Sequence, residues 1–200
     1  MKKFFASITA VIIALTLPAL AAAATWKIDP DHSSVGFKIR HLMVSNVKGS
    51  FNKYSGTVEL NEKDITKSKV EVSIETASID TNVQKRDDHL RSADFFDVAK
   101  FPAMTFVSKK VAKAGKDKLK VTGDLTLHGV TKEVVLNVEG PSAESKDPWG
   151  NLRRGASATT TINRKDFGLV WNKALETGGV VVGEEVQIIL EIEMIKAKDK

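Results

Sequence analysis

Apolar and polar residues alternate with a period of two along most of the chain beyond its first 24 residues. Successive side chains of a β-strand point to opposite faces, so this alternation predicts strands with one face in a core and the other in water. The alternating stretches, in chain order, are 35–39, 51–60, 70–74, 104–111, 119–127, 134–138, 156–162 and 186–194. Residues typical of hairpin turns separate them, as at His128-Gly129. The pattern therefore predicts roughly eight antiparallel strands.

One stretch, residues 82–93, departs from this alternation. It is polar, contains neither Gly nor Pro, and places Val83, Leu90 and Ala93 at helical spacing. We expect a short helix there that crosses from one part of the sheet to another. The residues that could cap its N-terminus are Asp80, Thr81 and Asn82.

The elements predicted between residues 25 and 200 belong to one domain, because no repeat, linker or low-complexity tract interrupts them. Their strands could form a closed barrel or a curved sandwich. Closure is favoured, because eight strands lose their exposed edges in that way and enclose room for one small ligand. The predicted fold is therefore an all-β, eight-stranded antiparallel β-barrel with a short helix between strands.

Residues 1–24 have the organisation of a secretory signal peptide. Lys2 and Lys3 form a basic start, a mostly apolar run follows, and small residues allow cleavage between Ala21 and Ala24. A membrane-spanning helix would need about 20 uninterrupted apolar residues, whereas a proline and several alanines end this run. We therefore expect a periplasmic protein, and the absence of cysteine excludes a lipoprotein.

Composition and charge exclude several other classes. With no cysteine among 200 residues, disulfides, thiolate metal sites and cysteine nucleophiles are excluded. Loss of the signal peptide would lower the basic residues from 30 to 28 against 25 acidic ones, and the formal net charge from +5 to +3. The densest basic run, residues 109–120, carries no aromatic side chain between its lysines, so we expect no nucleic-acid partner.

The polar residues do not form a recognisable catalytic or metal site. The histidines are His32, His41, His89 and His128, and no pair has the H-x-H or H-x-x-x-H spacing of a metal site. No G-x-S-x-G motif or phosphate-binding glycine loop occurs. The acidic residues near the predicted helix are interpreted as solvated capping groups rather than a catalytic pair. These acids are Asp87, Asp88, Asp94 and Asp97. The sequence thus predicts no catalytic residue, no metal site and no required cofactor.

Large aromatic side chains are numerous for one small barrel, because seven of the nine Phe and all three Trp lie beyond residue 24. In an eight-stranded barrel such rings either fill the interior or line a cavity, and residue type leaves both readings open. The sequence therefore points to function through its many large apolar side chains rather than through a polar catalytic or metal site.

Four blocks of sequence resemble the motifs of the YceI-like proteins, in that family's order and across essentially all of the chain beyond the signal peptide. The blocks are DPDHSSVGFKIRH at 29–41, RDDHLRSADFFDV at 86–98, GDLTLHGVTK at 123–132 and INRKDFG at 162–168. The resemblance implies an extended, lipocalin-like barrel that is secreted to the periplasm and holds a long polyisoprenoid or a related amphiphile. It implies no catalytic residues.

On this resemblance, the ligand is an isoprenoid lipid or another long-chain amphiphile, such as a polyisoprenoid or an isoprenoid quinone. We expect its tail to lie among Phe37, Ile39, Phe51, Val72, Ile74, Phe95, Phe96, Met104, Phe106, Phe167 and Trp171. We expect its head group to meet His32, His41, Arg86 or His89 near the mouth. The sequence leaves open whether the chain forms a homodimer and whether it meets a membrane redox or lipid partner.

Two other functions remain open at this point. An outer-membrane barrel also alternates with period two, but it would need aromatic girdles at both rims, and this chain has one tyrosine and a charged C-terminal end. We therefore do not expect an integral membrane protein. A hydrolase or another enzyme acting on a lipid would use His32, His41 or His89, and its turnover would disappear when that histidine is replaced by alanine.

Overall fold

The computed structural model describes residues 23–176 and 178–198, so the predicted signal peptide lies almost wholly outside the described residues. Within them, the strands are β1 (Ala24–Ile28), β2 (Ser34–His41), β3 (Ser45–Phe51), β4 (Tyr54–Leu60), β5 (Lys69–Glu75), β6 (Ile79–Asp80), β7 (Ala103–Gly115), β8 (Lys118–Leu127), β9 (Val130–Glu139), β10 (Ser145–Lys146), β11 (Leu152–Asn163) and β12 (Val182–Lys196). The α-helix α1 spans Gln84–Arg91, and the short 3-10 helices are η1 (Pro30–His32), η2 (Ile65–Lys67), η3 (Thr76–Ser78) and η4 (Arg164–Phe167). None of the helices in this part of the chain is long and apolar enough to cross a membrane.

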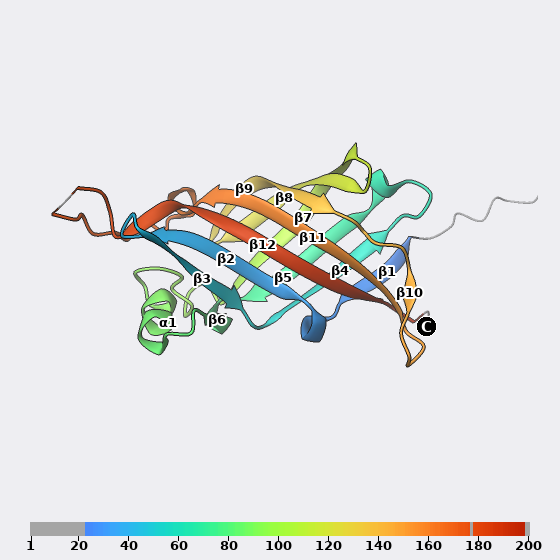
Figure 1. Ribbon diagram of the computed structural model, residues 1–200, viewed down its shortest axis with the longest axis horizontal. Helices are drawn as coiled ribbons and strands as arrows, with labels where there is room; N and C mark the ends of the chain where they lie inside the picture. Colours follow the sequence, from blue (N-terminus) through green and yellow to red (C-terminus); the bar gives the residue numbers. More distant parts are fainter. Residues whose placement is uncertain (1–22, 177, 199–200) are drawn as a thin grey trace, which may run out of the picture.

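Eight of the strands form a closed antiparallel barrel that is elongated along its axis (Figure 1). Around the ring they are β1, β4, β5, β7, β8, β9, β11 and β12. The ring closes because β12 pairs with β11 through residues 185–195 and with β1 through residues 194–196. The sequence prediction of an eight-stranded antiparallel barrel is therefore confirmed.

At one end of the barrel, β2, β3 and β6 extend the sheet beyond β1, β4 and β5. The strands are interrupted at residues 29–33, 52–53 and 76–78, which form a kink between the two parts. The 15-residue strand β12 spans both parts, because residues 182–191 pair with β2 and residues 194–196 with β1. The hairpin of β2 and β3 turns at residues 42–44. Figure 1 shows α1 beside β6 at this end, whereas β10 and the end of β12 lie at the other.

The alternating stretches of the sequence all fall within these strands, with 51–60 lying across the end of β3 and β4. The turn predicted at His128-Gly129 is also confirmed, since both residues have positive φ values, 52° and 75°, between β8 and β9. Strand β1 was not predicted. Its inward positions Trp26 and Ile28 are too few to reveal a period.

The predicted helix is confirmed as α1, although it is shorter than the stretch 82–93 and its predicted N-cap is wrong. The N-cap position is Val83, which makes no capping hydrogen bond through its side chain. Asp87 in the first turn instead accepts hydrogen bonds from the backbone N–H and the hydroxyl of Thr81. Asp87 is only 5% exposed, so its interpretation as a solvated acid is also wrong. Its carboxylate ties the helix to the segment that precedes it.

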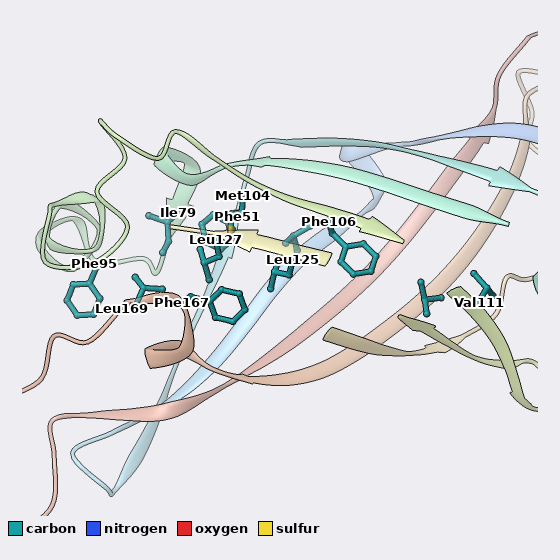
Figure 2. Packing of buried hydrophobic residues seen from close by; sticks show 12 residues of the cluster. Phe51, Ile79, Phe95, Met104, Phe106, Val111, Leu125, Leu127, Phe167 and Leu169 are labelled. Carbon is teal, nitrogen blue, oxygen red and sulfur yellow. The ribbon is translucent and has the colours of Figure 1, made fainter. Parts of the chain in front are cut away.

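The buried apolar side chains form one long cluster within the barrel and a smaller one near its end. Figure 2 shows the long cluster running from Phe95 and Leu169, close to α1, to Val111. The smaller cluster is formed by Trp26, Leu60 and Met194. The core thus follows the barrel axis.

Candidate binding cavity

A cavity of about 430 Å³ lies inside the barrel. Its walls are the inward-facing side chains of the barrel strands and of β2 and β3, joined by residues of α1, the segment after it and the segment 164–182. Most of these side chains are Val, Ile, Leu, Phe or Met, and no acidic residue of the described chain lines the cavity. A volume of this size is typical of sites for small molecules.

The alternation of β5 illustrates how the sequence builds this wall. Val70, Val72 and Ile74 line the cavity, whereas Glu71 and Ser73 between them are exposed. The same parity recurs in each barrel strand, because neighbouring strands are paired in register. An apolar interior is therefore a direct consequence of the period of two.

Two aromatic rings of the wall lie against glycines on neighbouring strands. A Cβ atom on Gly49 would lie 2.5 Å from Cζ of Phe37, and a Cβ atom on Gly123 would lie 2.5 Å from Cζ of Phe106. No side chain other than hydrogen fits beneath these rings as they stand. The two glycines therefore set where the rings lie across the cavity.

The structure brings together all but one of the residues predicted to hold a lipid tail. Those that line the cavity are Phe37, Ile39, Phe51, Val72, Ile74, Phe95, Phe96, Met104, Phe106 and Trp171. Phe167 does not line it, because η4 places this ring in the packed core, where it is 2% exposed. That these side chains contact a ligand stays a prediction.

Polar side chains gather at the end of the cavity between β2, α1 and the segment 164–182. The residues that line it there are Arg40, His41, Arg86, His89 and Arg164. Arg40 is exposed, and the side chain of His89 is 40% exposed, so this end of the cavity reaches solvent. We call this end the mouth. The charged residues that line the mouth are the cationic Arg40, Arg86 and Arg164.

His89 is held in the mouth by a carboxylate and two aromatic rings. Its Nε2 lies 2.9 Å from Oδ2 of Asp94. Its ring meets those of Phe95 and Trp171 edge to face, with centroids 5.0 and 4.9 Å away. Within the described residues, the side chain that hydrogen-bonds to this ring is Asp94.

Arg86 is oriented by the segment that precedes α1. Its Nε donates to the hydroxyl of Thr81 at 2.7 Å, and its Nη2 donates to the carbonyl of the same residue at 2.8 Å. The same hydroxyl donates to buried Asp87. Arg86 is therefore fixed at the cavity wall by one residue, with a buried carboxylate nearby.

Arg164 is a cavity-lining residue that the sequence analysis missed. It is 4% exposed, and its guanidinium donates to the carbonyls of Gly183, at 2.8 Å, and of Leu169 and Val182. Burial lowers its pKa because desolvation disfavours the charged form, and nearby Glu184 opposes this effect. The motif that carries Arg164 reads as polar surface sequence, so nothing in it signals burial. The structure thus adds a buried cation to the wall.

His32, also predicted to meet a head group, lies away from the cavity in an ionic network on the outer face of the barrel. Its Nδ1 lies 2.8 Å from Oδ2 of Asp29. Arg153 donates to Asp29 at 2.6 Å, to Asp147 at 2.7 Å and to Glu193 at 2.5 Å. Asp29, His32 and Glu193 are close enough together to suggest a metal site. The guanidinium of Arg153, however, already donates hydrogen bonds to both carboxylates, so we interpret the network as structural.

The end of the barrel opposite the mouth is closed by Trp26. Its side chain is fully buried against Leu60 and Met194, and it lies outside the lining of the cavity, which both of those residues join. Arg154 and Lys196 lie over its ring at 5.3 and 5.8 Å from the centroid. The cavity is therefore an apolar tube with one polar, solvent-reaching mouth, a shape that suits an amphiphile with a long tail.

Sequence comparisons place the chain among YceI-like proteins. The family model of the YceI-like domain matches residues 26–194. A UPF0312 protein of Vibrio parahaemolyticus is 46% identical over 168 residues, which cover 83% of this chain and 87% of the relative. Protein YceI of Salmonella newport is 43% identical over 180 residues, which cover 89% of this chain and 90% of the relative.

Solved structures share the fold. BcnA of Burkholderia cenocepacia superposes with a TM-score of 0.71 at 25% identity, covering 83% of this chain and 98% of BcnA. The YceI protein of Campylobacter jejuni gives a TM-score of 0.67 at 37% identity, covering 86% of this chain and 96% of that protein. A polyisoprenoid binding domain of Saccharophagus degradans gives 0.63 at 16% identity, covering 88% and 99%, a likeness of fold alone.

Proposed function

The chain belongs to the YceI-like family, and from this premise we propose that it is a periplasmic carrier that holds a long-chain isoprenoid lipid in its barrel and does not transform it. The lipid would be a polyisoprenoid or an isoprenoid quinone. The observation that carries the proposal is the cavity itself, which is apolar along its length and polar at one mouth. The polyisoprenoid binding domain of Saccharophagus degradans, which has the same fold, supports this class of ligand.

Transfer of an apolar tail from water into this tube is strongly favourable. Burial of apolar surface gains about 25 cal/mol per Å², so a tail that buries ~400 Å² gains ~10 kcal/mol before the costs of ordering it. Water in such a tube would find few hydrogen-bond partners, which favours its displacement. The tail needs no specific polar contact, so the width of the tube selects it.

The mouth would select the head group. Arg86 and Arg164 offer donors and positive charge, His89 adds a polar ring, and none of the described lining residues is a carboxylate. A head group that accepts hydrogen bonds, such as a phosphate, a carboxylate or a quinone carbonyl, fits this chemistry. The periplasmic location rests on the leader-like sequence of residues 1–24.

Native mass spectrometry of the protein purified from the periplasmic fraction, followed by lipid extraction, tests the proposal. We expect one isoprenoid lipid per chain, recovered intact after long incubation. A protein that comes without lipid and takes none from detergent-solubilised isoprenoids would contradict the carrier function. Conversion of the lipid into a product would show an enzyme instead.

A matched pair of substitutions tests whether the ligand lies in the cavity. Phe106 points into the cavity, whereas Val107, its neighbour in β7, is 46% exposed on the outer wall. We expect Phe106→Asp to lose the lipid and Val107→Asp to keep it. Circular dichroism shows whether both variants are folded. As a milder variant, Ile39→Glu changes a half-buried lining residue closer to the mouth, and lipid retained in folded forms of both inward variants would contradict the assignment.

A further inference from the structure

The tip of the β2–β3 hairpin, Leu42, Met43 and Val44, exposes apolar side chains directly beside the mouth. These residues are 39%, 52% and 75% exposed, respectively. His41, which precedes them, lines the cavity, and so does Val181, whose carbonyl accepts a hydrogen bond of 2.8 Å from the backbone N–H of Leu42. The tip is therefore continuous with the wall of the cavity where the cavity opens.

The backbone holds these side chains outward at a conformational cost. Leu42 and Met43 have φ values of 49° and 62°, in a left-handed region that bulky residues rarely adopt and that turns usually fill with Gly, Asn or Asp. Nη2 of Arg40 donates to the carbonyl of Met43 at 2.7 Å and fixes the turn. A turn whose sole task was to connect two strands would have no need of apolar residues here.

The hairpin that carries this tip is basic on its outer face. Lys38, Arg40 and Lys48 are its charged residues, and residues 34–51 contain no Asp or Glu. Lys38 and Lys48 lie opposite each other in the pairing of β2 with β3, on the face turned away from the cavity-lining side chains of Phe37 and Ile39. An apolar tip with basic flanks is complementary to the surface of an anionic bilayer, where apolar groups enter the interface and cations meet the head groups.

We infer that the mouth end docks on the surface of an anionic phospholipid bilayer, with Leu42, Met43 and Val44 inserted among the head groups, so that the cavity opens onto the membrane. This inference rests on the proposed function in one respect. Docking at the mouth would let a lipid pass between the membrane and the cavity without crossing water. Docking itself is set by the tip and its basic flanks and does not require the cavity to be filled.

Exposed Trp149 marks a second surface that could bind a membrane in place of the hairpin tip. It is 80% exposed, and aromatic residues commonly anchor proteins at membrane interfaces. It lies in the turn between β10 and β11, and Figure 1 shows β10 at the end of the barrel opposite α1. Docking through Trp149 would hold the mouth away from the membrane, so the two surfaces make opposite predictions.

Flotation with vesicles of phosphatidylethanolamine and phosphatidylglycerol tests the inference. We expect the wild type to float with these vesicles and the double variant Met43→Asp/Val44→Asp to bind them about tenfold more weakly or not at all. Val107→Asp, on the outer wall, is the matched control and should bind as the wild type does. Lys38→Gln/Lys48→Gln should weaken binding to these vesicles at low salt, since its effect is electrostatic.

Several outcomes would overturn the inference. They are absence of wild-type binding, loss of binding with Trp149→Asp instead of with the tip variant, and conversion of a wild-type dimer into a monomer by the tip variant in sedimentation velocity. Loading of an isoprenoid from detergent micelles separates docking from the carrier function. The tip variant should load as the wild type does, whereas a wild type that docks but never loads would contradict the carrier function and leave docking intact.

Discussion

Gly49 and Gly123 show how single residues shape the interior of this barrel. Each lies beneath a phenylalanine ring, and a Cβ atom at either position would come within 2.5 Å of that ring. Gly123 is also close to backbone, because its Cβ atom would lie 2.6 Å from the carbonyl oxygen of Val107. A ring can rotate away from a methyl group, but a paired strand cannot easily move. The cost of a side chain at Gly123 should therefore be high.

We predict that Gly123→Ala destabilises the protein by about 1–3 kcal/mol, the usual cost of forcing an extra carbon into a packed interior. The measurement is the free energy of unfolding in urea. Gly155→Ala is the control, because the nearest atom to its Cβ, the carbonyl oxygen of Ile192, lies 3.8 Å away. Gly155→Ala should be close to neutral, and an equal loss in both variants would show that the effect is general to glycines in strands.

The kink between β1 and β2 is fastened to β11 and β12 by the ionic network around Arg153. The hydrogen bond from Arg153 lowers the pKa of Asp29. Burial raises the pKa of Asp147, but hydrogen bonds from Arg153 and Asn151 outweigh it and hold that pKa well below its usual range. Asp29 and Asp147 are almost buried, so their charges depend on this guanidinium. The network joins segments far apart in the chain at the closure of the barrel.

Acid should therefore weaken the protein through this network. A carboxylate whose pKa is lower in the folded state contributes stability above its unfolded pKa, about 4 for Asp, and loses it as the pH falls towards the folded pKa. We predict that the Tm of the wild type falls as the pH drops from about 5 to about 2, and that Arg153→Met loses stability mainly at neutral pH and has a flatter acid limb. Lys109→Met, which removes exposed ion pairs with Asp124 and Glu133, should follow the wild-type curve. Parallel curves of Tm against pH for Arg153→Met and the wild type would show that the acid sensitivity does not come from this network.

The stability that His32 contributes should depend on pH in the opposite direction. Its hydrogen bond with Asp29 raises its pKa, so the stability it contributes is complete below about pH 6.5 and is lost as the pH rises through the higher folded pKa. We predict that His32→Gln lowers the Tm most in mildly acidic buffer and least in alkaline buffer. A constant difference across this range would show that the charge of His32 does not matter to the fold.

The elements could be predicted from the sequence because each depends on local pattern. Val72 and Phe106 face inward as their parity in β5 and β7 requires, and α1 follows from the loss of that parity. Arg153 and Arg164 could not be assigned in this way. Their contacts depend on carboxylates and carbonyls supplied by distant segments, such as Glu193 and Gly183, which only the closed barrel brings near. The place of Phe167 could not be assigned for a similar reason, since η4 turns its ring into the packed core.

At the scale of the whole molecule, one end of the barrel is closed and the other is open. Trp26 is fully buried at the closed end, while Arg40 and His89 lead from solvent into the cavity at the other. On the proposed function, we expect a tail that enters at the mouth to lie along the barrel axis and to reach the middle of β11. Ala158 lines this middle part, between Val138 of β9 and Leu190 of β12. It is the position at which the length of the tube can be tested.

We predict that Ala158→Phe shortens the tube and so reduces the stabilisation that the lipid confers. A ligand that binds the folded state raises the Tm, so the lipid-loaded wild type should melt above the delipidated wild type. Delipidated Ala158→Phe should melt at or above the delipidated wild type, because its ring fills empty space, but lipid should raise its Tm much less. Thr159→Phe, at the exposed neighbouring position, should keep the full increment. Scanning calorimetry with and without a long isoprenoid measures both values. An undiminished increment in Ala158→Phe would mean that the lipid does not reach the middle of the barrel, whereas a variant that takes only shorter isoprenoids would show that the depth of the tube sets the length of its ligand.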